Sequence, residues 1–124
     1  MLADLDNDSI PEFMYYDNIF AHWKDCYKCY LPPLIWRWDG EKYRLANYHY
    51  SDYILRDYDL SNLPCDQSWE TLIMLYYAGK DEIADSLFEV CWPLKSSEKE
   101  AEYKAFKRQL GYGQFWTQLQ ESDW

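Results

Sequence analysis

Closely spaced acidic side chains are the first feature of the chain that could do chemistry. In the segment 4–12, DLDNDSIPE, carboxylates occupy the first, third, fifth and ninth positions. A tightly wound loop turns alternate side chains inward, and a hard cation such as Ca²⁺ takes roughly six to eight oxygen ligands from carboxylates and backbone carbonyls. Without a cation, anions this close repel one another. The spacing therefore predicts a cation-binding loop, and the alternative is an exposed acidic turn that holds no ion.

The same segment resembles the D-x-D-x-D-G-x-x-[DE] calcium loop of the integrin-type FG-GAP and VCBS repeat families, including its apolar flanks, over residues 2–15. The resemblance implies a loop between two β-strands that holds Ca²⁺ through the carbonyl of Ile10 and through four side chains, those of Asp4, Asp6, Asp8 and Glu12. Ser9 stands where the families have glycine, so we expect a positive φ there. We expect a stand-alone loop rather than a multi-bladed propeller. An EF-hand is not expected, because Tyr15 stands where its bidentate Glu would be.

Aromatic residues are the second feature that could form a binding site. The chain has 7 Trp, 13 Tyr and 5 Phe, and exposed Tyr and Trp supply large, rigid contact areas. Successive strand residues point to opposite faces, so Trp36 and Trp38 should share one face of a sheet and Ile35 and Arg37 the other. Trp36 and Trp38, together with Tyr43, form a candidate platform for a protein or carbohydrate partner. The alternative is that this face packs against helices.

The elements that must position these residues begin with strands. Residues 12–16, rich in aromatic side chains, predict a strand after the acidic loop. Asp39-Gly40 between the alternating runs 34–38 and 41–45 predicts a hairpin with a two-residue or slightly longer turn. The alternating tyrosines that follow are expected to extend the sheet, namely Tyr48, Tyr50 and Tyr53.

Helical periodicity replaces strand alternation from about residue 66. It predicts a first helix over 69–76 that stops at Gly79. A second helix is expected to start at Asp81, with an apolar stripe of Ile83, Leu87, Val90 and Cys91. A third is expected to stop at Gly111, and a short fourth to lie near 115–119. Strands followed by helices indicate an α+β fold, a small antiparallel sheet packed by three to four helices. We expect one domain over 1–124, mainly β in 1–60 and mainly α in 66–122.

The charge distribution narrows the class of partner. The net charge of −10 disfavours nucleic acid, whose binding needs clustered Lys and Arg, and no apolar run is long enough to insert in a membrane. The segment 95–108 contains five bases and three acids, and we interpret it as a solvent-exposed helix face. The first residues lack the basic and apolar runs of an export signal. An extracytoplasmic location of bacterial type, periplasmic or secreted, is still expected, since millimolar calcium there suits a loop of modest affinity.

The four cysteines, Cys26, Cys29, Cys65 and Cys91, allow two disulfides in three connectivities, and buried free thiols are the alternative. The C-x-x-C pair at 26–29 does not predict a redox or zinc site. Residues 30–33, YLPP, cannot form the helix that a thioredoxin-like thiol needs, and no second metal-binding pair is present.

These observations favour a non-enzymatic binding module with an N-terminal Ca²⁺ loop. The only histidines are His22 and His49, and no Ser lies in a nucleophile-elbow pattern, so a catalytic triad has no support. The alternative function is a small acidic inhibitor or immunity-like protein that docks, without metal, on a basic protein partner. The sequence does not predict an oligomeric state.

Overall fold

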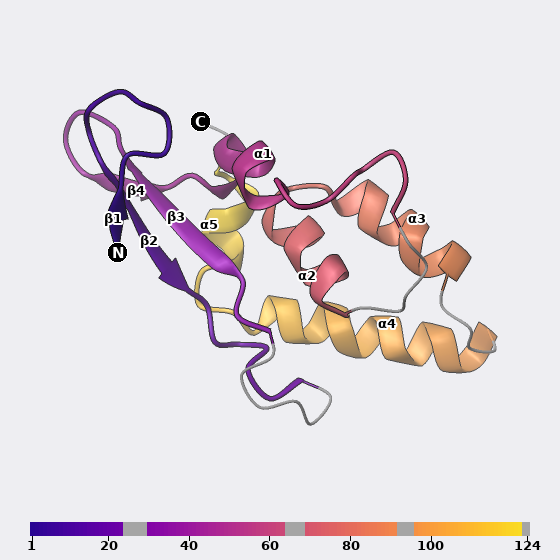
Figure 1. Ribbon diagram of the computed structural model, residues 1–124. Coiled ribbons are helices and arrows are strands. Elements are labelled where there is room, and N and C mark those ends of the chain that lie inside the picture. Colours follow the sequence, from indigo (N-terminus) through magenta and orange to yellow (C-terminus); the bar gives the residue numbers. More distant parts are fainter. Residues whose placement is uncertain (24–29, 64–68, 92–95, 123–124) are drawn as a thin grey trace.

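Residues that favour a pleated surface form a sheet in the N-terminal part of the molecule. The structure, a computed structural model, describes residues 1–23, 30–63, 69–91 and 96–122. Its sheet is antiparallel, with the strand order β1-β2-β3-β4 (Figure 1). The strands are β1 (Leu2–Ala3), β2 (Glu12–Tyr16), β3 (Pro33–Trp38) and β4 (Tyr43–Leu45). The expected strand over 12–16 is confirmed.

The predicted hairpin at Asp39-Gly40 joins β3 to β4. The Asp39 carboxylate accepts hydrogen bonds from the backbone N–H groups of Glu41 at 2.8 Å and Lys42 at 2.9 Å, and these bonds hold the pKa of Asp39 below its usual range. Gly40 supplies the turn with a φ of +102°. Because Trp38 pairs with Tyr43, the turn is longer than two residues and β4 begins later than residue 41.

The expectation that the later tyrosines extend the sheet is wrong. Residues 47–54 instead form the 3₁₀ helix η2 (Asn47–Tyr50) and the short helix α1 (Ser51–Ile54). The physical reason is the Asn47 side chain, which takes the place of a further strand residue. Its Oδ1 accepts from the Ile35 N–H at 2.8 Å, and its Nδ2 donates to the carbonyls of Pro33 at 2.9 Å and Tyr77 at 3.0 Å.

Asn47→Ala should lower the free energy of unfolding by about 3 kcal/mol, because it leaves buried backbone groups without partners, each at a cost of about 1 kcal/mol or more. The Asn47 side chain is fully buried, so water cannot replace its three hydrogen bonds. Urea denaturation followed by circular dichroism measures the change. Asn62→Ala, at an exposed position, is the control and should be nearly neutral. A loss for Asn47→Ala no larger than that of the control would contradict the bridging role.

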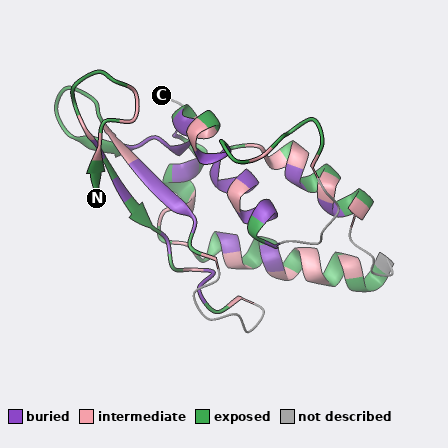
Figure 2. Ribbon diagram, in the orientation of Figure 1, coloured by how far each residue is buried: buried purple, intermediate pink, exposed green. Residues whose placement is uncertain are grey.

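The helices follow the sheet, as the α+β expectation requires. They are α2 (Trp69–Tyr77), α3 (Asp81–Cys91), α4 (Ser96–Gly111) and α5 (Trp116–Gln120). Helix α2 is buried on most of its surface, whereas α3 and α4 each show buried and exposed residues in alternation (Figure 2). The predicted stop at Gly79 is confirmed. Gly79 has a φ of +80°, and the Lys80 N–H donates to the Leu75 carbonyl at 2.8 Å, the bond of a Schellman cap.

The predicted apolar stripe of α3 is partly wrong. Val90 is 78% exposed, whereas Ala84 and Phe88 are buried. With 3.6 residues per turn, Val90 lies about 120° from Ala84 around the helix, outside the face that packs on the core. Cys91 is disulfide-bonded, which favours the bridged alternative for this cysteine. The other three cysteines lie outside the described residues.

Aromatic rings fill the region where the helices meet. Phe106 of α4 is fully buried, and its ring centroid lies 5.4 Å from that of Phe20 and 5.3 Å from that of Trp69. Trp23 and Trp69 meet edge to face, 5.4 Å apart at 86°. These contacts connect the segment after β2 to α2 and α4, so the sheet and the helices share one core. Within the described residues, no helix is long and apolar enough to cross a membrane.

Candidate metal centre

The loop between β1 and β2 gathers its acidic side chains at one point. One carboxylate oxygen from each of Asp4, Asp6, Asp8 and Glu12 lies within 4.8 Å of the others. All four side chains predicted as ligands are therefore brought together, between two antiparallel strands, and they could hold a metal ion. Carboxylate oxygens are hard ligands, which suit hard cations rather than thiophilic metals.

The backbone of the loop is wound by two residues with positive φ. Ser9 has a φ of +70°, which confirms the expected positive φ at this position, and Asn7 has a φ of +60°. The positive φ of Asn7 was not predicted from the sequence, although Asn adopts this conformation more readily than most residues. The Asp4 carboxylate accepts from the Asp8 N–H at 3.2 Å and from the Ser9 N–H at 3.0 Å. These bonds turn the chain back on itself and bring later acids beside Asp4.

The backbone of Ile10 lies next to this cluster. Its N–H donates to Asp8 Oδ1 at 2.8 Å, which closes a tight turn at the end of the loop. The Ile10 side chain is 43% exposed and contributes little to the core. Its carbonyl as a metal ligand stays a prediction.

Glu12 differs from the other three acids because it is buried, with 1% of its surface exposed. Its Oε2 accepts from the Leu5 N–H at 2.7 Å and its Oε1 from the Tyr50 hydroxyl at 2.9 Å. The Tyr50 hydroxyl also lies 3.2 Å from Asp6 Oδ2. Burial, together with the nearby carboxylates of Glu12 and Asp6, raises the pKa of the Tyr50 phenol well above its usual value. Tyr50 therefore stays a hydrogen-bond donor, and its single hydroxyl proton lies between the carboxylates of Glu12 and Asp6, nearer to Glu12.

Arg37 brings a positive charge to the same site. Its Nε lies 3.6 Å from Asp6 Oδ2, with both side chains partly exposed. The antiparallel register places Arg37 beside Glu12, because Phe13, which follows Glu12, pairs with Trp36, which precedes Arg37. Arg37 and Trp36 are consecutive in the strand and therefore lie on opposite faces of the sheet, as predicted. Arg37 therefore offsets part of the repulsion among the acids.

Tyr50→Phe should lower the free energy of unfolding by about 1–2 kcal/mol, because the buried Glu12 carboxylate loses a donor. It should also weaken metal binding by about tenfold, because groups that orient ligands typically contribute that much to affinity. Thermal melting and metal titration measure the two effects. Tyr112→Phe, at a residue that is 69% exposed, is the matched control and should change neither. Unchanged metal affinity in Tyr50→Phe would contradict the orienting role.

The aromatic platform, defined as Trp36, Trp38 and Tyr43, lies on the opposite face of the sheet from Glu12. Trp38 and Tyr43 form a cross-strand pair with ring centroids 5.3 Å apart, and they are 38% and 39% exposed. Trp36 is half-buried, because the ring of Phe115, which precedes α5, packs against it with the two centroids 5.4 Å apart. Trp36 therefore packs inside the fold, whereas Trp38 and Tyr43 keep an exposed surface.

The platform adjoins both an apolar hollow and the acidic loop. A cavity of about 400 Å³ is lined by Leu2, Phe13, Trp36 and Tyr43. The Tyr43 hydroxyl donates to the Pro11 carbonyl at 2.9 Å, in the last part of the acidic loop. A hydrogen bond therefore links the acidic loop to a residue of the platform.

Comparisons of the chain with protein-family models, with curated proteins and with solved structures found no match.

Proposed function

We propose that this protein is a binding module whose acidic loop takes Ca²⁺, and that the bound ion orders the loop beside the aromatic platform. The observation that carries the proposal is the convergence of four carboxylate oxygens within 4.8 Å of one another. Ca²⁺ accepts roughly six to eight oxygens in flexible geometry, whereas Mg²⁺ keeps its waters and uses fewer carboxylates. Four carboxylates on a short loop match the preference of Ca²⁺ better.

The electrostatics of the loop support a functional role for a cation. Four acidic side chains lie close together. Among the described residues, Asp6 forms an ion pair with Arg37, in which Asp6 Oδ2 and Arg37 Nε lie 3.6 Å apart. A divalent ion would replace mutual repulsion with attraction, and binding to the folded state alone stabilises that state by mass action. We place the protein outside the cytoplasm, because disulfides such as that of Cys91 persist in oxidising compartments, where calcium is abundant.

Calcium should raise the melting temperature on the order of 10 °C at a concentration of about 100 times the dissociation constant, equivalent to about 2.7 kcal/mol. Excess chelator should reverse the rise, and Mg²⁺ at the same concentration should produce a smaller one. Asp8→Asn keeps the acceptor for the Ile10 N–H but removes a ligand charge, so most of the rise should disappear. The control Asp57→Asn removes the same charge from an exposed residue outside the loop, and this variant should show the full rise in melting temperature. A melting temperature that is indifferent to calcium would refute the proposal.

The second candidate is the acidic inhibitor or immunity-like protein, which docks without metal. The exposed pair Trp38 and Tyr43 beside an acidic loop favours it, because aromatic anchors and complementary charge together suit a basic protein partner. The two candidates differ in their response to solution conditions. Partner binding that weakens with salt and persists in chelator supports docking without metal, whereas binding lost in chelator supports the calcium module.

A further inference from the structure

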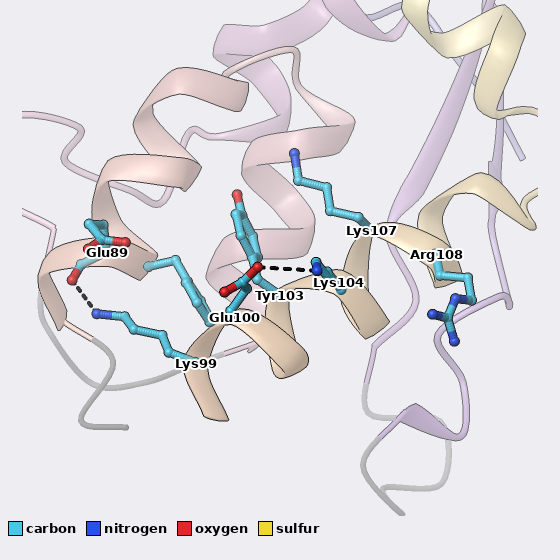
Figure 3. Close-up of a pocket in the computed structure, with 8 residues that line it drawn as sticks. Glu89, Lys99, Glu100, Tyr103, Lys104, Lys107 and Arg108 are labelled. Carbon is cyan, nitrogen blue, oxygen red and sulfur yellow. Dashed lines mark hydrogen bonds and ion pairs between the residues drawn. The ribbon is translucent and has the colours of Figure 1, made fainter. Parts of the chain in front are cut away.

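A pocket of about 730 Å³ lies between α3 and α4 (Figure 3). It is at the far end of the molecule from the acidic loop (Figure 1). Two aromatic residues line it, Phe88 of α3 and Tyr103 of α4, together with four bases of α4, Lys99, Lys104, Lys107 and Arg108. A volume of this size is within the range of small-molecule sites, roughly 300–1,000 Å³.

The charge of this pocket is opposite to that of the whole protein. The chain carries a net charge of −10, but the pocket lining has four bases against two acids, Glu89 and Glu100. Lys107 and Arg108 lie three and four residues after Lys104, so α4 presents these three bases on neighbouring turns. The interpretation of 95–108 as a plain solvated face omits the pocket that α3 forms with these residues.

The aromatic side of the pocket is held rigidly. The rings of Phe88 and Tyr103 stack with centroids 4.4 Å apart and an interplanar angle of 12°. The Tyr103 hydroxyl is hydrogen-bonded to the hydroxyl of Tyr76, which donates to Asp85. Lys107 is fixed at the same end, with its Nζ 5.1 Å from the Tyr103 ring and 3.6 Å from Asp85. A flat apolar group would therefore meet a preformed surface, which reduces the entropic cost of binding.

Two of the bases are suited to bind an incoming anion. Lys104 pairs with Glu100 at 3.1 Å, but both side chains are about 70% exposed, and such pairs exchange partners at little cost. Arg108 lies one helical turn further along, at an exposed position, and its planar guanidinium can hold a carboxylate through two parallel hydrogen bonds. Lys99, by contrast, donates to the Glu89 carbonyl at the other end of the pocket (Figure 3).

We propose that the pocket between α3 and α4 binds a small organic anion with a flat apolar body and a carboxylate head. The body packs against the half-buried ring of Tyr103, which Phe88 supports from behind, and the carboxylate pairs with Lys104 and Arg108. A nucleic acid is a poor fit, because the net charge of the protein repels a long polyanion. This site is separate from the acidic loop and does not depend on calcium.

The test uses the full chain in chelator and 1-naphthoate as the probe, followed by two-dimensional NMR of the backbone amides. We expect saturable shifts confined to α3 and α4, with a dissociation constant below about 1 mM. The double variant Lys104→Gln and Arg108→Gln should bind about tenfold or more weakly, because it removes both charged donors. Its control, Lys42→Gln and Arg56→Gln, loses the same charge at exposed positions in the other half of the chain and should bind like the unmodified protein.

Two further probes separate the parts of the proposal. Neutral 1-naphthamide should bind about tenfold more weakly than 1-naphthoate, because it lacks the charge. Inorganic phosphate should fail to displace 1-naphthoate at equal concentration, because it lacks the apolar body. The proposal is overturned by absence of saturation up to 10 mM, by equal affinity of the naphthamide or of phosphate, or by unchanged affinity in the Lys104 and Arg108 variant.

Discussion

Glu12→Gln should raise the melting temperature of the protein in chelator and abolish most of the rise that calcium produces. In chelator, the substitution removes one of four clustered negative charges, which should stabilise the fold by about 1 kcal/mol or more. The amide can keep the buried contacts, because its oxygen accepts from the Leu5 N–H and its nitrogen donates to the Tyr50 oxygen. Tyr50 then donates to Asp6.

In calcium, the same substitution should weaken binding on the order of 100-fold, because affinity in such loops depends on the number of charged ligands. The stability curves of the two proteins should therefore cross as calcium is added, which thermal melting at a series of concentrations detects. Glu70→Gln, at an exposed residue of α2, is the control and should parallel the unmodified protein. A lower melting temperature for Glu12→Gln in chelator would instead indicate that this carboxylate is a structural anchor.

Gly79→Ala should lower the free energy of unfolding by about 2–4 kcal/mol, through backbone strain and overpacking together. A Cβ at this position would lie 2.8 Å from Cγ of Tyr48, and the φ of +80° is unfavourable for any residue with a side chain. The Tyr48 ring is itself partly buried, so it has little room to move. Guanidinium denaturation followed by fluorescence measures the loss.

Gly111→Ala is the matched control for that experiment. A Cβ at Gly111 would meet no atom within 4 Å, and the residue is the last of α4. Alanine in a helix is favoured over glycine by about 0.5–1 kcal/mol, so this variant should be unchanged or slightly more stable. Equal losses in the two variants would show that neither the contact with Tyr48 nor the positive φ determines the effect.

The features that could be predicted are those that depend only on residues close together in the sequence. The acidic loop spans only nine positions, so alternate spacing suffices to indicate that Asp4, Asp6 and Asp8 converge. The Asp39-Gly40 hairpin is equally local, because the turn residues satisfy their own backbone groups. Such patterns do not depend on the rest of the fold.

The residues that were missed act over long separations in the chain. Tyr50 reaches Glu12 across 38 positions, and alternating tyrosines resemble a strand until the side chain of Asn47 ends the sheet. The pocket on α4 was missed for the same reason, since one of its sides belongs to α3. Periodicity describes each element separately and contains no information about which elements meet.

The contact between Trp23 and Trp69 has a spectroscopic consequence. Two indole rings held 5.4 Å apart at 86° form a chiral pair of chromophores in van der Waals range, fixed by neighbouring side chains. The native protein should therefore show a circular dichroism band from its aromatic transitions that vanishes when this pair separates. Tertiary packing at the junction of the sheet and the helices can be followed optically, without a label, in each of the variants described above.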